Sequence, residues 1–124
     1  MRIRISWKDG ELTGILNDSP TAQLVAKALP YTSSANTWGE EVYFDLPVAA
    51  KLDSNATDVV DPGTICYWVQ GRSLALPFGP TPVSRGNECR LVTAVNVLGK
   101  LESNPRDLAS VRDGDAITVS LESE

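Results

Sequence analysis

The sequence predicts a mainly β domain with one or two short helices, arranged as a barrel or a sandwich. About eight segments alternate polar and apolar residues or are rich in β-branched and aromatic residues, as half-buried strands are. They follow one another closely with no repeated strand–helix alternation. A closed barrel would also leave no exposed sheet edge. The chain has 124 residues and shows no linker or internal repeat, so we treat residues 1–124 as a single domain.

The N-terminal part predicts a hairpin followed by a helix. Residues 2–7 alternate strictly, and residues 12–16 return as a second strand after an Asp-Gly turn. A helix is predicted to start at Asp18-Ser19-Pro20, where either of the first two residues can cap it. It would place Leu24 on its apolar face and end before Pro30, after about three turns.

The rest of the chain is predicted to form strands, turns and loops. The expected strands are residues 41–46, 64–69, 73–78, 91–101 and 116–121. Gln70-Gly71-Arg72 and Asp113-Gly114 are expected to be tight turns. Residues 52–63 and 78–86 are expected to be loops, and residues 105–111 one helical turn.

Composition and charge argue against several classes of function. The net charge is −5, the pI is about 4.7, and the basic residues are scattered, which argues against nucleic-acid binding. No apolar run approaches the ~20 residues that span a bilayer. The N-terminus lacks the apolar region of a signal peptide. We therefore expect a soluble, cytoplasmic protein that does not bind membranes.

The chain contains no histidine and two cysteines, Cys66 and Cys89. Without histidine, the Ser-His and Cys-His nucleophile pairs are excluded. Two cysteines and no histidine also argue against a structural zinc site. We expect no metal and no cofactor. We expect the two cysteines to be separate thiols, and a disulfide between them is the alternative.

Three stretches resemble the cyclophilin family. Residues 9–29, with the Asp9-Gly10 turn and Pro20-Thr21-Ala22, resemble the cyclophilin start, where a strand, an Asp-Gly turn, a second strand and a Pro-x-Thr-Ala helix occur in that order. Residues 97–101, Val-Leu-Gly-Lys-Leu, resemble the cyclophilin strand Val-Phe-Gly-Lys-Val. Residues 63–78 lie where cyclophilins have a strand pair that ends in Phe-Phe.

The chain is more similar still to a family of small bacterial and archaeal cyclophilin-like proteins of unknown function. The matching motifs are residues 36–44, residues 63–71 with Gly, Tyr-Trp and Gly, residues 78–82 and residues 94–100. Their order and spacing cover nearly the whole chain. The resemblance implies a closed, eight-stranded β-barrel with helices at its ends, a choice that periodicity alone does not make.

The resemblance also implies where cyclophilin catalytic residues would lie, and most are missing here. Cyclophilins rely on an Arg that hydrogen-bonds the isomerising peptide, with Gln, His and Trp neighbours. No Arg occurs in residues 31–46, and the His position falls near Ala94 or Val95. Only Phe78 matches a residue of the proline pocket. Because catalysis needs specific stabilisation of the twisted bond, we expect weak or no isomerase activity and no catalytic residue.

The candidate binding residues lie mainly in two segments. Residues 36–41 offer an amide, an indole and two carboxylates beside a glycine turn. Residues 78–84 form a proline-stiffened loop with two hydroxyls. The structural alternative for the first segment is that Asn36 caps a turn and Trp38 packs over a barrel end. The alternative for the second segment is a structural connection without a binding role. The full set is Asn36, Trp38, Glu40, Tyr43, Trp68, Phe78, Thr81, Ser84, Arg85 and Asn96.

Three further expectations concern side-chain direction. Glu40 and Glu41 should point to opposite faces of a strand, which makes them a poor acid–base pair. Tyr67 and Trp68 should also alternate, one in the core and one in a cleft or at the surface. Asn96 lies among apolar neighbours and needs hydrogen-bond partners, so it would anchor the Gly-Pro-Thr-Pro loop or face a ligand.

These observations favour a non-catalytic binding module for a small molecule or a peptide. One alternative is a divergent peptidyl-prolyl isomerase that uses Phe78, the loop at residues 81–84 and a displaced Arg72 or Arg85. A second is an accessory subunit of an amide-processing hydrolase complex, which rests on fold analogy alone. A protein partner or a homo-oligomer also stays open.

Overall fold

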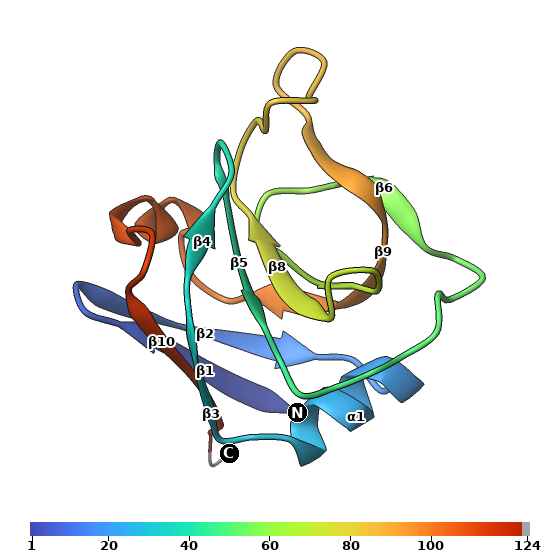
Figure 1. The fold of residues 1–124 in the computed structure, drawn as a ribbon, viewed down its shortest axis with the longest axis vertical. Helices are drawn as coiled ribbons and strands as arrows, with labels where there is room; N and C mark the ends of the chain where they lie inside the picture. The colour runs from blue at the N-terminus through green and yellow to red at the C-terminus, as the bar shows by residue number, and fades with distance from the viewer. Residues whose placement is uncertain (123–124) are drawn as a thin grey trace.

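The computed structural model describes residues 1–122, which form a mainly β domain (Figure 1). The strands are β1 (Arg2–Trp7), β2 (Gly10–Leu16), β3 (Tyr31–Ser34), β4 (Asn36–Thr37), β5 (Glu41–Asp45), β6 (Thr57–Val60), β7 (Thr64–Trp68), β8 (Ser73–Pro77), β9 (Cys89–Leu101) and β10 (Ala116–Leu121). The helices are α1 (Pro20–Lys27) and the 3₁₀ helix η1 (Pro105–Ser110). No helix within residues 1–122 has the length and apolar character needed to cross a membrane.

The strands form a nearly closed antiparallel barrel. Nine of them follow one hydrogen-bonded path, β3-β10-β1-β2-β9-β7-β8-β5-β4, and β6 pairs separately with β9. The two ends of the path, β3 and β4, are consecutive pieces of one segment interrupted at Ala35, so the sheet returns on itself. One seam remains between β3 and β5, where the Ser33 hydroxyl donates to the Asp45 carboxylate. The predicted mainly β barrel is confirmed, with nine strands in the path where eight were expected and with this seam in place of full closure.

Helix α1 covers one end of the barrel (Figure 1). Ser19 caps it by accepting a hydrogen bond from the Ala22 amide at 3.3 Å, as predicted for one of two residues. The helix has eight residues, about two turns, and ends before Pro30. The placement of Leu24 on the buried face is wrong, because this side chain is 42% exposed. Smaller side chains face the barrel instead and let the helix pack closely: Thr21, Ala22, Val25 and Ala26.

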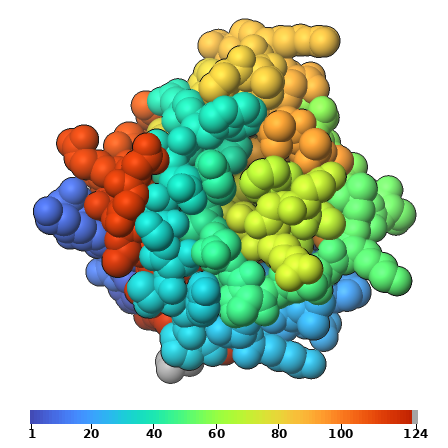
Figure 2. All heavy atoms as spheres, in the orientation of Figure 1, coloured from blue at the N-terminus to red at the C-terminus, as the bar shows by residue number. Residues whose placement is uncertain are grey.

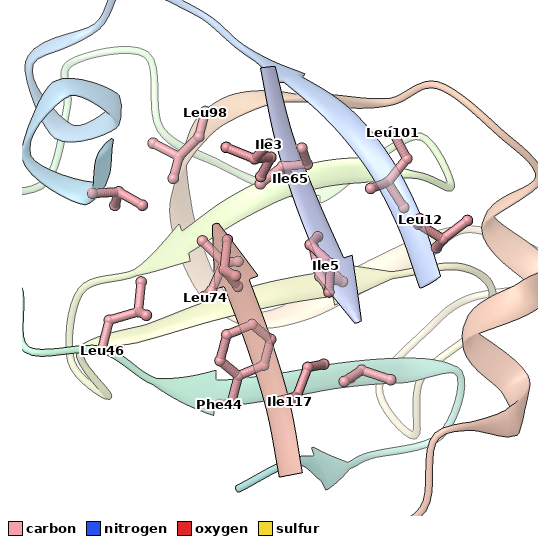
Figure 3. Close-up of a cluster of buried hydrophobic side chains, with 14 of the residues drawn as sticks. Ile3, Ile5, Leu12, Phe44, Leu46, Ile65, Leu74, Leu98, Leu101 and Ile117 are labelled. Atoms are coloured by element: carbon pink, nitrogen blue, oxygen red, sulfur yellow. The ribbon is translucent and has the colours of Figure 1, made fainter. Parts of the chain in front are cut away.

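The interior of the barrel is filled by apolar side chains from opposite walls (Figure 3). Phe44 of β5 and Leu74 of β8 point inward, and so do Ile3 and Ile5 of β1. Their strand neighbours must point outward because side chains alternate along a strand. A second, smaller cluster of buried residues therefore lies outside the barrel wall, and it consists of Cys66, Ala75, Leu91 and Val95.

Strand β9 is the longest, with 13 residues, and pairs with three other strands. Its first part pairs with β6 and its second part with β7 and β2. Ile65 of β7 pairs with Gly99 and Cys66 pairs with Val97, so Leu98 is the extra residue of a β-bulge. The prediction that residues 52–63 form only a loop is wrong in part, because β6 lies within them.

Candidate functional site

A pocket of about 230 Å³ lies on the outer face of the barrel wall. Figure 2 shows that the segment around β4 and β5, the β7–β8 turn and the outer part of β9 come together on the face toward the viewer. Three of the lining residues are aromatic and one is acidic. The lining consists of Trp38, Glu41, Tyr43, Trp68, Ala75, Leu91, Val92 and Val95.

The floor of the pocket comes from three neighbouring strands. Ala75 of β8 pairs with Tyr43 of β5 on one side and with Cys66 of β7 on the other. Its small side chain leaves room between larger neighbours. The rings of Tyr43 and Trp68 meet edge to face, with centroids 5.9 Å apart. The floor is therefore apolar and bounded by two rings at right angles.

Tyr67 and Trp68 divide as predicted, one into the core and one into the cleft. Tyr67 is fully buried inside the barrel, and its hydroxyl donates to the Val48 carbonyl. Trp68 lines the pocket. Its indole N–H donates to the Thr93 hydroxyl at 3.1 Å. The only polar atom of the Trp68 side chain thus has a hydrogen-bond partner, and the apolar ring forms part of the pocket wall.

A tight turn between β4 and β5 positions Trp38 and Glu41. The Trp38 amide donates to the Glu41 carbonyl at 3.0 Å, and Gly39 between them has a φ of +60°. The Glu40 amide donates to the Pro80 carbonyl at 2.9 Å. These bonds fix the turn against the following loop, so that its first and last side chains both reach the pocket.

Gly39→Ala is expected to destabilise the fold by about 2 kcal/mol. An added Cβ would strain the left-handed backbone, which costs roughly 1–2 kcal/mol, and would lie 2.9 Å from the Thr81 Cα. Gly86→Ala is the matched control, because Gly86 also has a positive φ but nothing lies within 4 Å of its added Cβ. Urea unfolding midpoints measure both. A loss for Gly39→Ala no larger than that for Gly86→Ala would show that the turn does not depend on this contact.

Glu41 is the unusual group in the pocket. Its side chain is 6% exposed, and its Oε1 has no hydrogen-bond partner among residues 1–122. Burial raises the pKa of this carboxyl from 4.5 to about 7. Cys66 and Cys89 lie near it, unpaired and buried. Burial, and secondarily nearby negative groups including Glu41, raises the pKa of both thiols.

The neighbouring basic side chains are paired with other acids. Arg106 binds Glu40 at 2.7 Å, and Arg90 binds Glu88 at 2.7 Å. No ion pair reaches Glu41 among the residues that the structure describes. The pocket therefore combines an apolar lining with one acidic group that lacks a counter-charge.

Three of the ten predicted binding residues line this pocket: Trp38, Tyr43 and Trp68. The prediction that Glu40 and Glu41 occupy opposite faces of one strand is wrong in part, because β5 begins at Glu41 and Glu40 lies in the preceding turn. Glu40 binds Arg106, which lies over the Phe78 ring at 5.4 Å. Phe78 itself is buried in the barrel core. Asn36 is exposed and makes one long hydrogen bond to the Tyr43 carbonyl, at 3.4 Å.

The proline-stiffened loop uses its hydroxyls internally. Ser84 accepts hydrogen bonds from the Thr81 amide at 2.9 Å and from the Arg90 amide at 3.2 Å. The Thr81 hydroxyl donates to the Arg90 carbonyl. The Arg85 amide donates to Glu88 at 2.9 Å. Thr81, Ser84 and Arg85 thus hold the loop against β9 and lie outside the pocket lining.

Asn96 is fully buried and anchors the long connection after β5, so the prediction that it would anchor the Gly-Pro-Thr-Pro loop at residues 79–82 is wrong. Its Nδ2 donates to the Thr21 hydroxyl at 3.0 Å and to the Lys51 carbonyl at 2.9 Å. Its Oδ1 accepts from the Asp53 amide at 2.8 Å. These bonds join the long connection after β5 to α1 and β9. Its amide is fully occupied by protein partners, away from the pocket.

Sequence reasoning did not select Glu41 as a binding residue. The adjacent Glu40 and Glu41 are the same residue type, but Glu40 lies in the turn and Glu41 is the first residue of β5. A signal was available, because Glu41 shares the face of Tyr43 two residues later, and Tyr43 was selected.

The chain has relatives of known structure. A family model described as Cyclophilin-like matches residues 1–120. The solution structure of the hypothetical protein AF2241 from Archaeoglobus fulgidus is 37% identical to the chain, with a TM-score of 0.84. That match covers 98% of this chain and 95% of the archaeal one. No curated protein matches the sequence.

Proposed function

Because the chain belongs to the cyclophilin-like family and carries an aromatic pocket on its outer wall, we infer that it is a binding module for a small, mainly apolar ligand. The observation that carries this inference is the pocket itself. Two indoles and a phenol surround an apolar floor, and one polar atom, Glu41 Oε1, has no partner within the described residues 1–122. Small-molecule sites typically combine such a lining with a few polar groups that orient the ligand.

The geometry supports binding over prolyl isomerisation. The residues proposed to rebuild an isomerase site do not come together at the pocket. Phe78 lies in the barrel core, Arg72 lies in the β7–β8 turn, and Arg85 lies in the exposed loop before β9. The described lining contains no arginine to bind the isomerising peptide group.

The test is an NMR titration of the folded protein with indole as a probe. We expect shifts at the Trp38 and Trp68 indole N–H signals and along residues 91–95. Ala75→Leu should abolish these shifts, because its longer side chain fills the floor. Trp68→Ala should weaken binding by about tenfold, the equivalent of about 1.4 kcal/mol of lost ring contact.

Leu24→Ala is the control, because Leu24 is exposed on α1, outside the pocket lining. It should bind indole as the parent does. Shifts confined to another surface, or an Ala75→Leu variant that binds normally, would refute the pocket as the binding site.

We also expect no prolyl isomerase activity. A short Xaa-Pro peptide should isomerise at its uncatalysed rate, over about 10–100 s at 25 °C, in the presence of the folded protein. The Phe78→Ala and Arg72→Ala variants are measured in the same assay for comparison. Catalysis that the parent shows and these variants lose would instead establish a rebuilt isomerase site.

A further inference from the structure

The unpartnered oxygen of Glu41 indicates what kind of ligand the pocket accepts. Buried polar side-chain atoms nearly always have a hydrogen-bond partner, and each exception needs an explanation. Here the carboxylate belongs to a residue that lines a pocket, so a ligand that reaches Glu41 can supply the missing partner. Since an ionised carboxylate only accepts hydrogen bonds, that partner must be a donor or a cation.

The aromatic rings favour a cation over a neutral donor. Faces of Trp and Tyr attract organic ammonium groups, and sites for methylated ammonium ions typically gather several such rings. Trp38, Tyr43 and Trp68 lie around the same pocket, and the last two meet at 88°. Rings at right angles bound a compact ligand group on two sides.

The surrounding charges favour a cation as well. The ionisable groups around Glu41 are the Cys66 thiol of β7, the Cys89 thiol of β9 and the Glu40 carboxylate of the same turn. Arg106 and Arg90 bind other carboxylates. A cationic ligand would therefore bring the positive charge that the protein side chains leave out of this pocket, and an anionic ligand would face a carboxylate.

We propose that the pocket binds a small organic ammonium ion, with the cationic group between the three aromatic rings and the Glu41 carboxylate. This proposal rests on the pocket being the binding site inferred above, and it adds the chemical class of the ligand.

The pH dependence of affinity follows from the state of Glu41. An ammonium ion binds the ionised carboxylate, so its affinity should rise as the pH increases through about 7, the pKa of Glu41. A ligand that needs the protonated carboxyl should show the opposite trend. A quaternary ammonium probe keeps its charge at every pH, so any trend reports the protein.

The experiment compares choline with 3,3-dimethylbutan-1-ol, which has the same shape but carbon in place of the charged nitrogen. A second pair is benzyltrimethylammonium and benzyl alcohol. NMR titrations at about pH 6 and about pH 8 give four affinities for each pair. We expect the cation of each pair to bind at least about tenfold tighter than its neutral counterpart at the higher pH, and to weaken about tenfold at the lower pH.

Two variants assign the effect to one carboxyl. Glu41→Gln should lose both the preference for the cation and the pH trend, with its dispersed amide signals showing that it remains folded. Glu40→Gln is the matched control, because the neighbouring Glu40 binds Arg106 outside the pocket lining. It should keep the parent's preference and trend.

The outcomes separate this proposal from the proposed function. If indole binds in the pocket but the cations bind no better than their neutral counterparts, the ammonium proposal is wrong and the binding module stands. The same holds if Glu41→Gln keeps the preference. If neither indole nor any cation shifts the pocket signals, both proposals are wrong.

Discussion

Glu41→Gln should remove most of the pH dependence of the unfolding free energy between about pH 4.5 and about pH 7. The Glu41 pKa is raised from 4.5 to about 7 in the folded protein. In this window the folded protein keeps a proton that the unfolded chain has lost, so the stability of the parent falls as the pH rises. At about 1.4 kcal/mol per pH unit, the loss amounts to about 3 kcal/mol. The neutral glutamine lacks this loss and should be more stable than the parent at about pH 8.

Other shifted groups act outside this window. Arginine partners lower the pKa of Glu88, Glu102 and Glu122, so their contribution is lost only as the pH falls below the ordinary glutamate value. Burial raises the pKa of Cys66 and Cys89. Their contribution to the unfolding free energy is therefore lost only at alkaline pH, above the ordinary cysteine pKa.

Urea unfolding at several pH values measures the effect, with Glu40→Gln as the matched carboxyl-to-amide control. The control should show the same slope as the parent. If the unfolding free energies of Glu41→Gln and the parent change in parallel with pH, the Glu41 carboxyl is ionised and hydrated in the folded protein.

Asn96→Ala should destabilise the protein by about 3 kcal/mol. The change removes three hydrogen bonds and leaves the Thr21 hydroxyl, the Lys51 carbonyl and the Asp53 amide without their partner. Each buried group left without a hydrogen-bond partner costs roughly 1–3 kcal/mol. Lys51 is exposed, so water can bond its carbonyl and the total cost is smaller than the sum over the three groups. The truncation also leaves a small cavity.

Two readouts test this effect. The unfolding midpoint should fall far more than in Asn36→Ala, since Asn36 is exposed and such changes are usually within about 0.5 kcal/mol. The Asp53 amide should also lose protection from hydrogen exchange, because its acceptor is gone. If Asn96→Ala matches Asn36→Ala in stability, the three hydrogen bonds do not hold the loop.

The sequence predicted the elements whose local pattern agrees with their final environment. Residues 2–7 alternate because one side faces the barrel interior, and they form β1. Ser19 and Pro20 mark the start of α1 through capping chemistry that depends on few distant contacts. Residues 64–68 and 73–77 are strongly apolar because β7 and β8 are almost entirely buried.

The missed strands are short and polar. Residues 31–34 and 57–60 become β3 and β6 only through pairing with β10 and β9, which lie far along the chain. Residues 36–37 are too short to show a strand pattern and become β4 by pairing with β5 across a tight turn. Local propensity carries little information about such pairing. The number of strands and the position of the seam were therefore outside the reach of sequence patterns.

The pocket was predictable in part. The sequence identified three of the pocket's aromatic side chains: Trp38 on a polar turn, Tyr43 in the strand after it and Trp68 at a strand end. The hydroxyls of Thr81 and Ser84 resemble ligand-binding groups in sequence, but the fold brings Arg90 beside them and uses them there. Which of two adjacent glutamates enters the pocket depends on the register of β5 against β8, which only the folded sheet defines.

The two faces of β5 have a consequence for how this family can diversify. Val42 and Phe44 are part of the barrel core, and Glu41 and Tyr43, which alternate with them, form the pocket wall. Under the binding function proposed above, substitutions at the pocket positions would change the accepted ligand while the alternate positions preserve the barrel. Proteins that share this fold are therefore expected to diverge in ligand preference sooner than in architecture, with Glu41 as the position to compare first.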